Sequence, residues 1–166
     1  GADGWGFPPT VAFGPNSAKP HHEPGDRKLQ EGDAIIMDIG ATVHGYTADL
    51  TRTNWLGEPP ARLAEIYTIV QNAQDAALAT IRAGVPANVV DAAARDVIVS
   101  AGYGEQFVHG LGHGIGVRIH DGPFLHGKND DPLPTNSILT IEPGIYIRDF
   151  GGVRIEDVVL VTVEGY

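Results

Sequence analysis

Cysteine is absent from the 166 residues, so disulfides and thiolate metal sites are excluded. Positive charge is scarce: eleven Lys and Arg side chains stand against twenty-one Asp and Glu, which gives a formal net charge of −10. This balance argues against a nucleic-acid partner, which would need clustered basic side chains. Apolar runs of membrane-spanning length and an N-terminal signal pattern are also missing, so we expect no membrane partner and a cytoplasmic setting.

The order of the expected elements predicts an α+β fold. Short runs of apolar, β-branched and aromatic residues predict strands at 10–13, 34–40, 46–57, 137–147 and 153–163. Between them, apolar residues recur at helical spacing over 59–83 and 86–101, which predicts two long helices. The glycine-rich stretch 109–116 is expected to be a loop. We therefore expect two helices on one face of a curved antiparallel sheet.

Two acidic side chains lie in the first expected hairpin. If its strands pair symmetrically about a turn at 43–44, Asp38 lies directly opposite Asp49. Directly opposed residues of an antiparallel pair point to the same face, and like charges placed in this way are destabilising. A β-bulge would change this register, so the interpretation depends on regular pairing.

The second expected hairpin repeats this arrangement. Symmetric pairing about a turn at 149–150 puts Glu142 opposite Glu156, again among apolar neighbours. One interpretation is that all four acids face solvent. The other is that they are buried together, which costs several kcal/mol per unpaired ion. The basic residues offer no obvious partner for each acid, whereas two divalent cations would cancel about four negative charges.

The stretch GLGHGIG, residues 110–116, places a single imidazole among four glycines. We interpret His113 as a nitrogen ligand and its glycines as positions where the backbone approaches a crowded site. Oxygen ligands with one imidazole favour Mn, Co or Fe over metals that prefer thiolates. Two such ions lower the pKa of a bridging water and polarise a carbonyl or phosphoryl oxygen, so the expected chemistry is hydrolysis.

Four segments together resemble the pita-bread metallopeptidases, the family of methionine aminopeptidases, prolidases and aminopeptidase P. They are MDIGATVHGYTADLTRT, HGLGHGIG, TIEPGIYI and GVRIEDVVLV. The resemblance implies a pita-bread fold and two divalent metal ions, with Mn first and Co, Zn or Fe as alternatives. It also implies five metal ligands, which fall on Asp38, Asp49, His113, Glu142 and Glu156.

Within this family, GYTADLTRT and GPNSAKPHH are similar to the prolidase and aminopeptidase P branch. That likeness implies a small peptide substrate with proline in second position, cleaved before the proline by a metal-bridging hydroxide. Glu142 would then shuttle the proton. His109 and His120 would contact substrate and stabilise the oxyanion, His21 would line the active site, and Arg154 would bind substrate.

Two interpretations remain open at the arginines. Arg154 could equally orient a metal-binding carboxylate instead of touching the substrate. We expect Arg52 to form a structural ion pair. His44 and His126 are interpreted as surface residues, and His22 more as an exposed loop residue than as part of the site.

The extent of the chain departs from the family's usual pattern. Residues 1–166 are interpreted as a single catalytic domain that is truncated at its N-terminus, without the two helices of the first half and without an N-terminal domain. An inactive metal-binding or peptide-binding fragment is therefore an alternative function, and a hydrolase similar to methionine aminopeptidase is another.

We expect the protein to form a homodimer. A sheet face without its two helices would expose several hundred Å² of apolar surface, which is more than monomers usually leave open. A partner chain that covers this face removes that cost. Light scattering should give the mass of a dimer, and a stable monomer that binds little hydrophobic dye would contradict the expectation.

Overall fold

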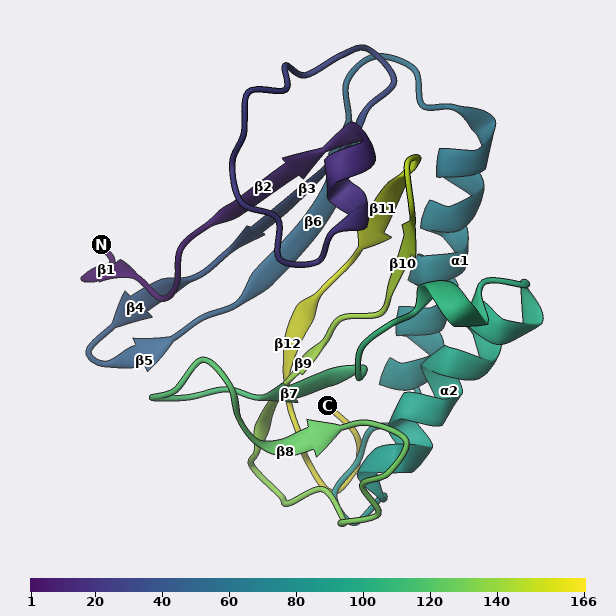
Figure 1. Ribbon diagram of the computed structural model, residues 1–166. Helices are drawn as coiled ribbons and strands as arrows, with labels where there is room; N and C mark the ends of the chain where they lie inside the picture. Colours follow the sequence, from purple (N-terminus) through teal and green to yellow (C-terminus); the bar gives the residue numbers. More distant parts are fainter.

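The computed structural model describes residues 1–166 and has the predicted α+β fold, with antiparallel sheets and two helices (Figure 1). No α-helix precedes Ala61, as predicted. The first half consists of six strands, which are β1 (Gly4–Trp5), β2 (Thr10–Phe13), β3 (Ala34–Ile39), β4 (Ala41–Val43), β5 (Tyr46–Thr47) and β6 (Leu50–Trp55). They form two three-stranded antiparallel sheets, in the orders β2-β3-β6 and β1-β4-β5.

The second half contains both helices, α1 (Ala61–Leu78) and α2 (Ala87–Ser100). Its strands are β7 (Gly112–Gly114), β8 (Asp121–Leu125), β9 (Ile138–Ile141), β10 (Gly144–Ile147), β11 (Gly151–Arg154) and β12 (Asp157–Leu160). Two short 3-10 helices, Gly14–Ala18 and Gly104–Gln106, complete the fold. The two helices pack against each other, α1 lies on β9, β10 and β11, and α2 lies on β8 (Figure 1).

The helix α1 begins at Ala61, two residues later than predicted, with Pro60 at its N-cap. Its predicted end at residue 83 is wrong, because the helix stops at Leu78. The N–H groups of Thr80 and Ile81 donate to carbonyls only three residues earlier, which tightens the last turn. This turn brings Ile81 into the core at 2 % exposure.

Three predicted strands are each interrupted by two residues. The returning strand of the first hairpin breaks at 48–49, and the two strands of the second hairpin break at 142–143 and 155–156. The predicted loop at 109–116 is wrong in its centre, because Gly112–Gly114 forms β7 within the four-stranded sheet β12-β9-β7-β8. Backbone contacts to both neighbours hold this glycine-rich segment extended.

One hydrophobic core joins the helices to the second-half strands. Ile66 and Val70 of α1 and Ala94 and Ile98 of α2 are fully buried in it. Burying each large aliphatic side chain stabilises the fold by roughly 1.5–3 kcal/mol. Neither helix combines the length and apolar character that crossing a bilayer requires.

The sheet β2-β3-β6 has one buried and one open face. Side chains such as Ala12, Ile36 and Thr51 are buried on the inner face. On the outer face, Val11 is 50 % exposed and the cross-strand partners Ile39 and Leu50 are 41 % and 38 % exposed. The expected homodimer would bury an exposed apolar surface of this kind. The homodimer itself stays a prediction.

Candidate metal centre

A cavity of about 770 Å³ lies between the inner face of the first-half sheet and the second-half strands. All five side chains predicted as metal ligands line it, and so do the predicted substrate residues. Six of the seven histidines line it as well. The exception is His44, which is exposed and occupies a turn, in agreement with its interpretation as a surface residue.

In the first hairpin, the predicted register is wrong by two residues. Asp38 lies opposite Thr51 and not opposite Asp49. The reason is the turn, which is centred on His44 and Gly45, both with positive φ, one residue later than expected. Because the shift is even, Asp38 and Asp49 still point to the same side of the hairpin and both line the cavity.

In the second hairpin, the predicted register is confirmed. Gly144 pairs with Arg154 in one ladder and Ile141 pairs with Asp157 in the next. Glu142 and Glu156 lie between these two ladders, at the interruptions of their strands, and their side chains are directed to the cavity. The glutamates therefore face each other at an opening in the sheet.

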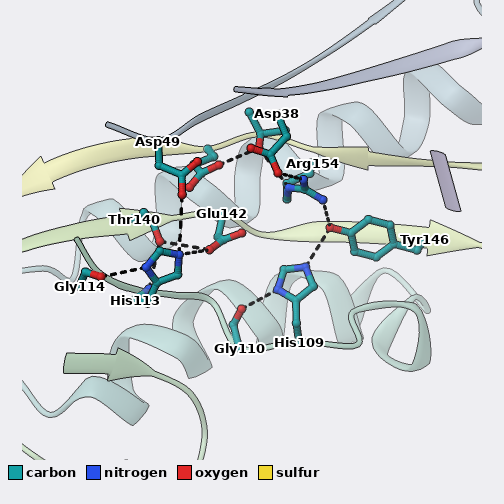
Figure 2. A network of polar contacts seen from close by, with 12 residues as sticks. Asp38, Asp49, His109, Gly110, His113, Gly114, Thr140, Glu142, Tyr146 and Arg154 are labelled. Atoms are coloured by element: carbon teal, nitrogen blue, oxygen red, sulfur yellow. Dashed lines mark hydrogen bonds and ion pairs between the residues drawn. The ribbon is translucent and has the colours of Figure 1, made fainter. Parts of the chain in front are cut away.

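His113 is buried at the centre of β7, where the backbone fixes its orientation. Its N–H donates to Thr140 Oγ1 at 3.0 Å, and its Nδ1 donates to the carbonyl of Gly114 at 2.9 Å. Nε2 is then left facing the acids, 3.4 Å from Glu142 Oε1 and 3.9 Å from Asp49 Oδ2 (Figure 2). An imidazole held in this way presents one free nitrogen to a cation.

The side chains of Asp49, His113 and Glu156 each offer a ligand atom within 4.8 Å of the others. Glu142 adjoins the same group through His113. Two buried oxygens, Asp38 Oδ1 and Glu156 Oε1, have no hydrogen-bond partner. Buried acceptors without donors are rare and need an explanation, and a pair of divalent cations fits both the orphaned oxygens and the donor set.

The pKa values of this group are those of buried carboxyls without a positive charge beside each of them. Burial, with the nearby Asp38, raises the pKa of Asp49 to about 7. Burial also raises the pKa of Glu142 and Glu156 well above the ordinary value, and each has acidic neighbours that add to the shift. The pKa of His113 is lowered by burial. Without a cation, the three carboxyls therefore favour their protonated forms, whereas His113 favours its neutral form.

Arg154 is buried at 4 % exposure and joins the acids to a second histidine (Figure 2). Its Nη2 donates to Asp38 Oδ2 at 2.6 Å, and its Nη1 donates to the hydroxyl of Tyr146 at 2.9 Å. Tyr146 also lies 2.9 Å from His109 Nε2. Because its donors are used in this way, Arg154 has the geometry of a residue that orients a carboxylate. This geometry favours the interpretation that Arg154 orients Asp38 over the interpretation that it binds substrate.

The remaining histidines differ in how closely they approach the acids. The ring of His120 lies 4.4 Å from the ring of His113, whereas His21 lies in the wall formed by the 20–24 loop. Sequence reasoning placed His22 and His126 outside the site, but both line the cavity at its edge. Their positions in the sequence, close to His21 and His120, could have indicated that they line the same cavity.

Sequence reasoning also missed polar partners of the site besides Thr140. Tyr146 bonds Arg154 and His109, and Thr51 donates to Glu156 Oε2 at 2.7 Å. Gln74 contacts the backbone beside both glutamates. Gln74 could have been found, because it is a polar residue four positions after Val70 on the apolar stripe of α1.

Known proteins resemble this chain throughout its length. The model of metallopeptidase family M24 matches residues 1–163. The probable dipeptidase PepE of Mycobacterium tuberculosis is 49 % identical over 156 residues, which are 93 % of this chain and 42 % of that protein. Two solved structures superpose with a TM-score of 0.97 and cover 99 % of this chain: the X-Pro aminopeptidase from Thermotoga maritima, at 45 % identity, and the prolidase from Pyrococcus furiosus, at 42 %.

The chain belongs to metallopeptidase family M24. Its fold is the pita-bread fold of the prolidases, as the sequence resemblance implied. The chain spans less than half the length of these relatives, since it covers 42 % of PepE, 47 % of the aminopeptidase and 49 % of the prolidase.

We predict that Gly112→Ala destabilises the protein. A Cβ at this position would lie 2.0 Å from the carbonyl oxygen of Thr140, a backbone atom that cannot move aside. Overpacking of this kind costs roughly 1–3 kcal/mol. Thermal denaturation measures the change, and Gly116→Ala is the control, because nothing lies within 4 Å of its Cβ. Equal melting temperatures for the two variants would contradict the prediction.

We also predict that Mn²⁺ stabilises the protein more as the pH rises. The pKa of Asp49 is raised to about 7 and those of Glu142 and Glu156 are raised too, so the metal-free protein loses stability as these groups ionise. The lowered pKa values of His109 and His113 act in the opposite direction, but only below the ordinary histidine value of 6.5.

The measurement is the melting temperature with a chelator and with Mn²⁺, from about pH 6.5 to about pH 8. The metal-free protein should melt progressively lower across this window, and the increase on adding Mn²⁺ should grow. KCl at equal ionic strength controls for screening. A metal-induced shift that is absent, or that shrinks with pH, would disprove the prediction.

Proposed function

We propose that the protein hydrolyses the peptide bond preceding proline, with residues 1–166 as its catalytic domain. The observation that carries the proposal is the convergence of buried acids around the free nitrogen of His113, with two orphaned carboxylate oxygens. The names of the relatives, a dipeptidase, an X-Pro aminopeptidase and a prolidase, support the same reaction.

Five residues would hold the metal ions: Asp38, Asp49, His113, Glu142 and Glu156. Their four carboxylates match the charge of two divalent cations, and their oxygen-rich composition favours Mn, with Co, Zn and Fe as alternatives. When bound, such a pair lowers the pKa of water and polarises the carbonyl of the scissile bond.

Glu142 would move the proton. Its carboxylate borders the cavity, accepts a hydrogen bond from Thr140 Oγ1 at 3.1 Å and lies 3.4 Å from His113 Nε2. A carboxylate placed at the cavity border is a group that can accept a proton from water and pass it to a leaving amine. Its Oε atoms would take the proton of the attacking water and deliver it to the proline nitrogen, which becomes the leaving amine.

Two histidines would stabilise the negative charge that develops on the carbonyl oxygen. Burial lowers the pKa of His109 to about 4, so its imidazole is neutral near pH 7 and has one N–H. Its Nδ1 donates to Gly110 O at 2.7 Å and its Nε2 accepts from the Tyr146 hydroxyl, so His109 would donate to the carbonyl oxygen only after exchanging the bond to Gly110. His120 is more exposed, lies beside His113 at the open side of the cavity and would be the direct donor. A donor that is already in place lowers the barrier because it needs no reorganisation.

The cavity lining offers apolar surface to a proline ring. Its apolar and ring side chains include Phe7, Pro8, Pro20 and Phe124. A Xaa-Pro bond has no N–H to satisfy and carries a rigid apolar ring. The partner is therefore a small peptide with proline in second position.

The test is hydrolysis of Ala-Pro in the presence of Mn²⁺, with Met-Ala as the competing substrate. We predict cleavage of Ala-Pro. Glu142→Gln should reduce kcat by at least 10²-fold, the effect expected for loss of a positioned proton-transfer group. Glu65→Gln, at an exposed glutamate of α1, is the matched control and should leave the rate unchanged.

The other outcomes distinguish the alternative functions. Preferential cleavage of Met-Ala would indicate a hydrolase similar to methionine aminopeptidase. Two bound ions per chain without any turnover would indicate a metal-binding or peptide-binding fragment. Full activity of Glu142→Gln would show that this side chain does not transfer the proton.

A further inference from the structure

The opening in the sheet that presents Glu142 and Glu156 is held from its outer face. On the cavity side, the N–H of Glu142 donates to Leu111 O at 2.9 Å, and the N–H of Glu156 donates to Thr51 O at 3.1 Å. The two glutamates are thus bonded to different neighbouring segments. Their separation depends on whatever fixes the backbone at this break.

Gln74 of α1 contacts the residue before each glutamate. Its Nε2 donates to Ile141 O at 3.2 Å, to Ile155 O at 3.5 Å and to Asp157 Oδ2 at 3.0 Å. Its side chain belongs to the helix layer and is 5 % exposed, on the side of the sheet away from the cavity. One amide group therefore spans both edges of the opening.

Arg52 of β6 holds the same opening from the first half of the chain. Its Nη2 donates to Asp157 Oδ1 at 2.6 Å, and its Nη1 donates to the carbonyls of Glu156 and Thr51. The ion pair confirms the structural role predicted for Arg52. Asp157 accepts from both Arg52 and Gln74, so it joins the two contacts into one network.

Packing alone does not account for Gln74. The neighbouring positions of its helix face, such as Val70 and Ala77, are apolar and fully buried. An apolar side chain at position 74 would pack α1 equally well, and burying an amide is costly unless it is hydrogen-bonded. What the amide adds is its set of contacts to the sheet opening.

We propose that Gln74 and Arg52, joined through Asp157, form a clamp that positions Glu142 and Glu156 for metal binding. The inference rests on the proposed function. Both are positioning residues, since they contact Asp157 and the backbone beside the glutamates and do not line the cavity. Functional groups must be held within about 0.5 Å of the productive geometry, and loss of outer partners of ligands typically lowers metal affinity 10–100-fold.

The test is Mn²⁺ titration by calorimetry of Gln74→Met and Arg52→Met. Methionine keeps the length of glutamine and replaces most of the aliphatic stem of arginine, and it removes the donors of both. Each variant should bind Mn²⁺ about 10–100-fold more weakly. Val70→Ala controls for loss of packing on α1, and Arg82→Met, at an exposed arginine, controls for loss of charge. Both controls should retain the affinity of the unsubstituted protein.

Each outcome decides the proposal. Unchanged affinity in Gln74→Met and Arg52→Met overturns the clamp, and so does an equal loss of affinity in the controls. If Gln74→Met does not fold, Arg52→Met decides, because its side chain is 42 % exposed and is tolerated more easily. An unsubstituted protein that binds no Mn²⁺ overturns the clamp together with the proposed function, whereas failure of the clamp alone leaves Ala-Pro hydrolysis intact.

Discussion

The constraint on which the structure depends is the burial of several carboxyl groups close together. Asp49 and Glu156 are buried beside one another and beside His113, and Glu142 completes the group. Their raised pKa values express the cost of this arrangement, because burial and mutual repulsion both disfavour the charged forms. A bound cation would offset this cost, and the strand breaks and hydrogen bonds around the acids suit that role.

Breaks in the strands place three of the four acids. Asp49 lies between β5 and β6, Glu142 between β9 and β10, and Glu156 between β11 and β12. A continuous antiparallel ladder satisfies its backbone groups internally and spaces its side chains regularly. Where the ladder breaks, the backbone groups bond to other segments, as those of Glu142 and Glu156 do, and the side chains can converge.

Sequence reasoning predicted the strand register correctly where the hairpin is symmetric about the expected turn. It failed where the position of a turn or a contact between distant segments determined the geometry. The pairing of Glu142 with Glu156 followed from a symmetric turn around Asp149, which has positive φ. The register of Asp38 failed because the turn at His44 lies one residue later than expected. A strand at Gly112 could not be foreseen, since it depends on pairing with β8 and β9, which come later in the sequence. Gln74 was visible only as a polar residue in an apolar stripe.

The charge of the proposed ligand group favours two cations over one. Its four carboxylates and the guanidinium of Arg154, which pairs with Asp38, carry three net negative charges. One divalent cation would leave this group negative, and the remaining negative charge would repel both hydroxide and the oxyanion of the proposed reaction. Two divalent cations leave one positive charge, which attracts both. Arg154 therefore has an electrostatic effect besides orienting Asp38. Without its positive charge, two cations would only neutralise the four acids. No excess positive charge would then remain to stabilise the negative charge that develops in the reaction.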